Sequence, residues 1–378
     1  MSSKLRFVDT NKSRFYSTVK ERVEQYFVVN KISKNANLAM YFKLTFFLSG
    51  SLALYLTIIS GVLLPNLWLA FGCCLLLGFF GAMIGFNVSH DSIHGSLSAN
   101  PKINKLISYS FCFIGANPYM WNISHNIVHH TFTNIPGHDE DIEVAPGLVR
   151  LSPLDKVNAL HRYQHFYAFL LYGLAAISWI FRKDFKKFFQ KEIGNYNNTN
   201  HPRIAYFELF FFKFLYYFLV IVLPLMILPI TWWQFAIGFV GLQLMKGFVI
   251  GLVFQLAHVV EGTEFPEPNE DGNIEEAWAI HQMQTTANFS RTSWLASFLC
   301  GGLNMQIEHH LFPKVCHIHY PQISEIVKIT AMEFGVPYIE NKTFWSALVS
   351  HYRTLRYFGK YTLEGRNEIV VSSSSMVA

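Results

Sequence analysis

The chain has 378 residues, 51% of them hydrophobic, and a formal net charge of +5 at pH 7. The apolar residues, which include 36 phenylalanines, gather in long blocks, and this excludes an ordinary soluble domain. No basic stripe with interleaved aromatic residues is present, which argues against a nucleic-acid partner. The five cysteines form no CxxC pair and are expected to be free thiols in a reducing compartment. Composition therefore predicts an integral membrane protein.

Residues 1–39 are polar and contain no apolar signal region. Between Ser13 and Lys31, four apolar side chains recur at helical spacing opposite a charged face, and they are Phe15, Val19, Val23 and Phe27. We expect a cytoplasmic amphipathic helix that lies on the membrane surface. An ordinary surface helix is the alternative.

Residues 40–89 and 204–258 each contain two apolar segments long enough to cross a hydrocarbon core of about 30 Å. A proline-containing turn divides each pair, at Leu64-Pro65-Asn66 and at Pro229-Ile230-Thr231. These turns lack ionisable residues, and tryptophans typical of a membrane interface stand beside them. We therefore predict an all-α fold with four transmembrane helices in two hairpins. The charged loops, both termini and every histidine then lie on one side, which the positive-inside rule makes the cytoplasm.

Residues 90–203 and 259–360 are predicted to form a helical cytoplasmic cap that holds the metal site. Two apolar stretches in its first part, Leu106–Met120 and Phe166–Phe181, are shorter than the roughly 20 residues of a span. We expect them to be re-entrant or interfacial, because a span there would place the histidines on opposite faces.

The basic stretch 182–191 suits a helix on anionic headgroups, and a docking surface for an acidic electron carrier is the alternative. Residues 361–378 form a tail that we expect to be disordered at its end. Lys246 lies midway along the fourth predicted span, where a charge is costly, and the sequence offers no firm account of it. We treat residues 1–378 as one domain.

Histidines occur in three spaced boxes, H-D-S-I-H, W-N-I-S-H-N-I-V-H-H and Q-I-E-H-H, and one further histidine ends the fourth apolar segment. Imidazole is a ligand that iron, zinc and copper all accept. A structural or hydrolytic zinc takes three or four ligands, whereas this set is large enough for two ions. The candidate metal ligands are His90, His94, His125, His129, His130, His258, His309 and His310.

Two further residues are candidate catalytic residues. Gln306 stands one helical turn before His309 and His310, where its amide can offer a neutral oxygen to a metal or to its bound water. Asp91 adjoins the first box. Together with Glu308 and the acidic run 139–141, it could hold imidazole N–H groups and fix the ring orientation. For the acidic run, a solvated loop is the stronger alternative.

These motifs resemble the membrane fatty acid desaturases. The resemblance rests on the three boxes, on the histidine that ends the fourth segment, on H-Q-M-Q-T-T-A-N-F at 281–289 and on L-N-M-Q-I-E-H-H-L-F-P at 303–313. It implies a four-span fold, a di-iron centre in the cap, and the oxygen-dependent removal of two hydrogens from a fatty acyl chain, on CoA or on a lipid, to form a cis double bond. Gln306, where many members carry histidine, resembles the front-end branch. The chain is also similar to bacterial linoleoyl-CoA desaturase-like enzymes, which implies a bacterial inner membrane.

The sequence carries neither an H-P-G-G motif of a fused cytochrome b5 domain nor a nucleotide-binding glycine loop. The resemblance therefore implies that electrons come from a separate ferredoxin or cytochrome b5. A related di-iron hydroxylase or ketolase would share the boxes. A metal transporter would need ligands within its spans, and a zinc-dependent hydrolase would hold one zinc, so both are weaker alternatives.

Overall fold

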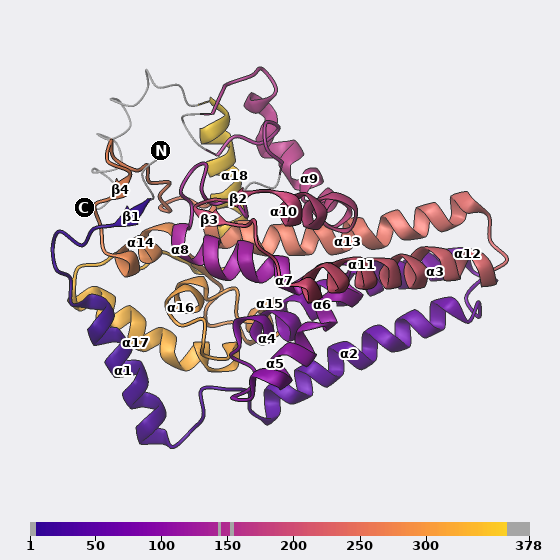
Figure 1. Ribbon diagram of the computed structural model, residues 1–378, viewed down its shortest axis with the longest axis horizontal. Coiled ribbons are helices and arrows are strands. Elements are labelled where there is room, and N and C mark those ends of the chain that lie inside the picture. The colour runs from indigo at the N-terminus through magenta and orange to yellow at the C-terminus, as the bar shows by residue number, and fades with distance from the viewer. Residues whose placement is uncertain (1–4, 143–144, 152–154, 361–378) are drawn as a thin grey trace.

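The computed structural model describes residues 5–142, 145–151 and 155–360, and these are mostly helical, as predicted. Figure 1 shows the long helices α2, α3, α11 and α13 running side by side to the right, away from a wider region of shorter helices on the left. We call the first part, residues 38–84 and 203–258, the bundle. We call the second part, residues 90–142 and 259–360, the cap. The tail at 361–378 lies outside the described residues.

The bundle consists of two helical hairpins whose turns lie where the prolines predict them. The first joins α2 (Leu38–Ile59) to α3 (Leu67–Ile84), and the side chains of Asn37 and Asn66 cap the two helix starts by accepting backbone N–H groups. The second joins α11 (Arg203–Tyr217), η5 (Phe218–Val222) and α12 (Leu223–Ile227) to α13 (Trp232–His258), which a Thr231 capping box begins. Trp68 and Trp232 are exposed at the far end of the bundle.

A fifth helical run is longer than the apolar stretch Phe166–Phe181 that the sequence marks. The 3₁₀ turn η3 (His161–Tyr163), α9 (Gln164–Ser178), the π-helix η4 (Trp179–Lys183) and α10 (Asp184–Phe189) form one run of 29 residues, because polar residues at both ends join the helix. By length and composition, five helices of the described chain could cross a membrane.

Both ends of this fifth run contact the cap. At its start, the side chain of Gln164 donates to the carbonyl oxygen of Leu355 at 2.8 Å. Near its end, Lys187 pairs with Asp141 at 3.0 Å. Both ends of the run are therefore fixed to the cap, and whether the run crosses the membrane or re-enters stays a prediction.

Glycines allow the long helices of the bundle to pack closely. A Cβ atom at Gly78 would lie 2.3 Å from the carbonyl oxygen of Leu242, and one at Gly247 would lie 2.3 Å from that of Gly173. No larger residue fits at either position without moving a backbone. α13 is therefore held tightly between α3 and α9.

Three lysines of the bundle are buried, Lys43, Lys213 and Lys246, and for the last two the structure supplies partners that the sequence does not reveal. Lys246 on α13 donates to the carbonyl oxygen of Ile114 at 2.6 Å. Lys213 on α11 donates to the carbonyl oxygen of Gly115 at 2.8 Å and pairs with Asp184 at 2.8 Å. These carbonyls follow the end of α6 (Ser110–Phe113), so the charges satisfy backbone groups that a helix end leaves open.

The cap is built from short helices. The first box continues α3 through the π-helix η1 (Gly85–Ser89) into α4 (His90–His94). The other helices are α5 (Pro101–Ser108), α7 (Pro118–Trp121), η2 (Asn122–His129), α8 (His130–Phe132), α14 (Trp278–Thr285), α15 (Trp294–Cys300), α16 (Gln306–Leu311), η6 (His317–His319), α17 (Tyr320–Glu333) and α18 (Phe344–Lys360). Two-residue strands pair β1 (Arg6–Phe7) with β4 (Asn273–Ile274), β2 (Glu192–Ile193) with β3 (Tyr196–Asn197) and β5 (Asn288–Phe289) with β6 (Glu340–Asn341).

The N-terminal helix forms as predicted, but its apolar face does not meet a membrane. α1 (Phe15–Asn30) buries all four of its predicted apolar side chains, with exposed fractions of 0 to 3%. They pack with α14 and α17 in one hydrophobic cluster of the cap. The expectation of a helix lying on lipid by this face is therefore wrong, because a segment 300 residues away covers it.

Candidate metal centre

Four segments that are far apart in the sequence bring all eight candidate histidines together. His90 and His94 come from α4, His125 and His129 from η2, His130 from α8, His258 from the last residue of α13, and His309 and His310 from α16. All eight are buried, with exposed fractions from 0 to 6%. η2 is a π-helix, and in it the rings of His125 and His129 stack with centroids 4.8 Å apart.

The histidine nitrogens form two groups that share a boundary. In each group, one nitrogen per residue lies within 4.8 Å of the others. The first group is His90, His94, His125 and His309, and the second is His129, His258 and His310. His130 joins His309 and His310 in a third set between them. The arrangement therefore offers two adjacent positions for metal ions.

The pattern of unused nitrogens fits metal ligation. The Nε2 atoms of His90, His94, His125, His129, His130 and His309 are buried and have no hydrogen-bond partner among the described residues. Buried polar atoms without partners are rare, because each costs free energy, and a metal ion would satisfy them. Burial also lowers the pKa of His125 to about 4 and holds those of His130 and His309 well below the usual value. The rings are therefore neutral, which is the form that binds a metal.

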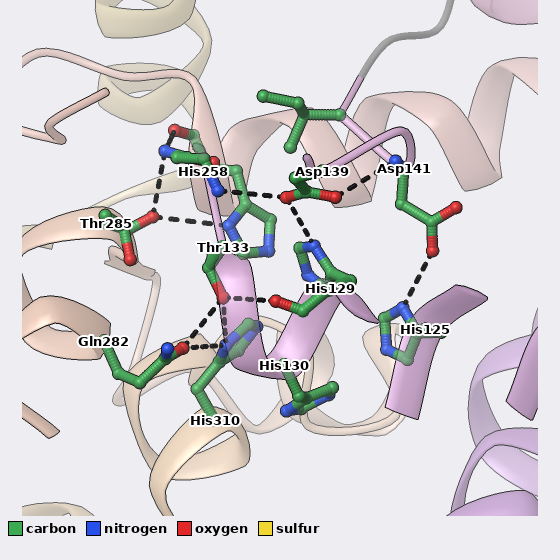
Figure 2. A network of polar contacts seen from close by, with 12 residues as sticks. His125, His129, His130, Thr133, Asp139, Asp141, His258, Gln282, Thr285 and His310 are labelled. Atoms are coloured by element: carbon green, nitrogen blue, oxygen red, sulfur yellow. Dashed lines mark hydrogen bonds and ion pairs between the residues drawn. The ribbon is translucent and has the colours of Figure 1, made fainter. Parts of the chain in front are cut away.

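The opposite ring nitrogens are held by neighbouring side chains (Figure 2). His129 Nδ1 lies 2.8 Å from a carboxylate oxygen of Asp139, and His125 Nδ1 lies 3.4 Å from Asp141. His310 Nδ1 lies 2.7 Å from the side-chain oxygen of Gln282. Such contacts fix the tautomer and the orientation of a ligand ring.

The sequence favoured a solvated loop for the acidic run 139–141. In the structure, Asp139 and Asp141 instead contact rings of the candidate ligands. Asp139 is 1% exposed, and it also accepts the backbone N–H of Asn134 at 2.9 Å. Asp141 is bound from behind by Lys187 at 3.0 Å and Lys183 at 3.3 Å. Although burial alone would raise it, these lysines hold the pKa of Asp141 well below the usual range.

The basic stretch 182–191, which the sequence predicts to suit anionic headgroups, is partly turned inward. Lys187 is only 5% exposed and Asp184 only 2%. Arg182 and Lys186 remain exposed. The lysine that the sequence assigns to headgroups thus supports the acidic run behind the metal centre.

The side chains of Asp91 and Glu308 form their hydrogen bonds and ion pairs, among the described residues, with residues other than the eight candidate ligands. Asp91 is buried and forms an ion pair with Nδ1 of His317, and Ser96 donates to it at 2.9 Å. Glu308 accepts from Asn288 and from Tyr338, both at 2.8 Å. Burial raises the pKa of Glu308 to about 7. Both carboxylates therefore connect box helices to other parts of the cap.

Gln306 lies at the second group of histidines. Its amide nitrogen is 2.9 Å from Nε2 of His258 and 3.2 Å from Nε2 of His310. The side chain is 2% exposed. The amide therefore stands beside two ring nitrogens that the sequence assigns to a metal.

Sequence reasoning missed three residues that orient ligand rings. Gln282 holds His310, and it also accepts from Thr133 at 2.8 Å. The hydroxyl of Tyr320 lies 3.2 Å from Nδ1 of His309. The stretch 281–289 carries part of the family resemblance, so it could have marked Gln282, whereas no local pattern marks Thr133 or Tyr320.

Comparison with known proteins agrees with this site. The fatty acid desaturase family model matches residues 66–342. An acyl-lipid (8-3)-desaturase of Physcomitrium patens is 38% identical over 366 residues, covering 96% of this chain and 75% of that protein. An sn-1 linoleoyl-lipid 6-desaturase of Synechocystis sp. is 37% identical over 360 residues, covering 93% of this chain and 97% of that protein. An acyl-lipid (8-3)-desaturase of Mortierella alpina is 31% identical over 352 residues.

The family match spans most of the sequence, and the segments that it covers include all eight buried histidines. Five helices of the described chain are long and apolar enough to cross a membrane, and 51% of the residues are hydrophobic. The protein is therefore an integral membrane protein. The chain therefore belongs to the fatty acid desaturase family of oxidoreductases, as its histidine boxes predicted.

Proposed function

We propose that this protein introduces a cis double bond into the fatty acyl chain of a membrane lipid. The new bond would lie between an existing double bond and the carboxyl end, as in front-end desaturation. The observation that carries the proposal is the convergence of eight buried histidines from four distant segments into two adjacent groups, in which six Nε2 atoms have no partner among the described residues. The proposal of a lipid substrate draws on the printed names of the relatives, which mention acyl-lipid and linoleoyl-lipid.

Two irons, held by the eight histidines with Gln306 beside the second group, would supply with O₂ the oxidising power that an unactivated methylene requires. The reaction balances when the two hydrogens of the acyl chain, two electrons and two further protons reduce one O₂ to two waters. The two electrons come from a separate protein, a ferredoxin or a cytochrome b5. Within the protein, Asp139, Asp141 and Gln282 hold the imidazole rings of the metal ligands in one tautomer.

An apolar cavity on the bundle side of the metal centre suits the acyl chain. It has a volume of about 930 Å³ and lies between α3, α9, α13, α15 and α18. Met83 and Val253 line it, and they stand seven and five residues before His90 and His258 on the helices that carry those ligands. At 1.5 Å per residue, the cavity begins roughly 10 Å from the centre. We call it the apolar chamber and assign to it the methyl end of the substrate.

For the topology we propose four spans, α2, α3, α11–α12 and α13, with the run from His161 to Phe189 re-entering from the cap side. This topology puts the cap and both ends of the described chain in the cytoplasm. The resemblance to bacterial enzymes supports a bacterial inner membrane as the location. Contacts of both ends of the run with the cap support this arrangement. Reporter fusions after residues 145 and 195 should then show the same side.

The activity is tested by expression in a host with defined fatty acids, followed by mass spectrometric location of new double bonds. We expect linoleoyl chains of membrane lipids to gain a double bond at carbon 6. Hydroxylated chains instead of new double bonds would contradict the desaturase proposal. New double bonds only in acyl-CoA would contradict the lipid substrate.

A further inference from the structure

A second cavity lies on the outer side of the first two histidine boxes. It has a volume of about 390 Å³ and is bounded by α4, α5, α7, η2 and the first turns of α11. This volume falls within the range of small-molecule sites, about 300–1,000 Å³. We call it the polar groove, and the residues that matter below are Lys105, Tyr109, Asn122 and Glu208.

The polar groove opens where the bundle meets the cap. Glu208 lies in the second turn of α11, near the end of the bundle that carries the cap. Ile204 of α11 lines the groove and is 52% exposed, and Phe207, one helical turn further along α11, is 58% exposed. An apolar rim suits contact with lipid, so a headgroup at this level can enter the groove sideways from the membrane.

The groove carries no net charge. Among the residues that line it, Lys105 and Glu208 are the only ones whose side chains are charged at neutral pH, and they pair at 3.2 Å. The hydroxyl of Tyr109 donates to the same Glu208 oxygen at 2.6 Å. A phosphate would therefore meet a carboxylate and a lysine that is already paired. This disfavours an anionic headgroup.

The groove nevertheless offers both donors and acceptors. The contacts of Glu208 occupy one of its two carboxylate oxygens. Asn122 uses its side-chain oxygen to accept from Asn126 at 2.7 Å, and its amide nitrogen makes no hydrogen bond among the described residues. A hydroxyl group both donates and accepts, so it can form a hydrogen bond with either of these groups.

We propose that the polar groove binds an uncharged, hydroxyl-rich headgroup of the lipid whose acyl chain is desaturated. The inference rests on the proposed lipid substrate and adds the chemistry of its headgroup. Sugar hydroxyls supply neighbouring donors and acceptors for Glu208 and Asn122 without a charge.

The position of the groove also accounts for where the double bond forms. Ser92 and Ile93 line it and lie between His90 and His94 on one short helix, and Asn122 lies three residues before His125. The groove and the metal centre are thus separated by about one helix diameter, roughly 10 Å. A headgroup held here keeps the ester end of the acyl chain near the metal centre, and the longer methyl end extends into the apolar chamber. The position of the new double bond is then set by its distance from the carboxyl end.

The test measures lipid binding to the purified full-length protein by native mass spectrometry, with four lipids that carry the same linoleoyl chains. These are a monoglycosyl diacylglycerol, a diacylglycerol, a phosphatidylcholine and a phosphatidylglycerol. We expect the glycosyl lipid to bind about tenfold more tightly than the phosphatidylglycerol. Glu208→Gln and Asn122→Ala should each bring this ratio close to 1. Lys102→Gln, an exposed change on the same helix α5, is the matched control and should keep it.

Each outcome is decisive when iron content confirms that the variants are folded. Equal binding of all four lipids, or tighter binding of the phosphatidylglycerol, would overturn the headgroup proposal. Tight binding of diacylglycerol alone would also overturn it, since one hydroxyl would then suffice. If the glycosyl lipid binds selectively but no lipid is desaturated in the presence of reduced ferredoxin, the proposed function fails and the groove assignment stands.

Discussion

Two sites in this molecule bury histidine equally well, yet they use it in opposite ways. His351 on α18 is fully buried, and both of its ring nitrogens are engaged, Nδ1 at 2.6 Å from the carbonyl oxygen of Val259 and Nε2 at 2.7 Å from the hydroxyl of Tyr172. His130 in the metal centre is 6% exposed, and neither of its ring nitrogens has a partner among the described residues. Burial alone therefore does not mark a metal ligand. A buried nitrogen left open, in a group of such nitrogens, does.

The largest effect should come from removing an open nitrogen. His130→Ala should abolish desaturation and lower the iron content of the purified protein, because His130 joins the two groups of ligands. Treatment of the unchanged protein with an iron chelator should have the same effect on activity, and added Fe²⁺ should restore it. Metal analysis and product analysis of the same preparation measure both. His138→Ala, which changes a histidine outside the eight candidate ligands, is the control and should retain iron. Full iron content and turnover in His130→Ala would contradict the assignment of open buried nitrogens as metal ligands.

The next effect concerns Gln306, whose amide lies beside two ring nitrogens but is not a histidine. Gln306→Ala and Gln306→His should both lose most desaturation while the protein still inserts, since an amide oxygen and an imidazole nitrogen differ as ligands. Product per unit of membrane-inserted protein is the measurement. If Gln306 only packs α16, the alanine variant should instead lose about 1 kcal/mol of stability and keep its turnover.

The smallest effect should come from His351, where a loss is structural. Burial lowers its pKa to about 4 from 6.5, so between these pH values the unfolded chain takes up a proton that the folded protein excludes. Its contribution to stability is therefore complete above pH 6.5 and is lost as the pH falls to about 4, by about 3 kcal/mol in all. Thermal unfolding in detergent at pH 7.5 and pH 5 should show a shallower loss in His351→Gln than in the unchanged protein. An equal slope in the two proteins, or loss of iron in the variant, would argue against a purely structural histidine.

This contrast also shows what the sequence could reveal. The bundle was predictable because proline turns interrupt long apolar runs. The seven boxed histidines stood out because their spacing repeats, and His258 stood out because it ends the fourth apolar run. The partners of those histidines were not predictable in the same way. Asp139 and Asp141 look like a solvated loop until Lys187 and the box helices close around them. The stripe of α1 looks suited to lipid because its cover, α17, begins 290 residues after that helix ends.

The two buried lysines of the second hairpin, Lys213 and Lys246, have a consequence for how the chain is made. Every partner of Lys213, namely Gly115, Trp179, Ile180 and Asp184, precedes it in the sequence, and Lys246 likewise binds Ile114 and Tyr216. During synthesis each of these two lysines thus reaches the membrane after the groups that it will bind. An ammonium group in hydrocarbon is costly, so the second hairpin can settle only against a first half that is already in place. The order of residues along the chain is thereby also an order of assembly.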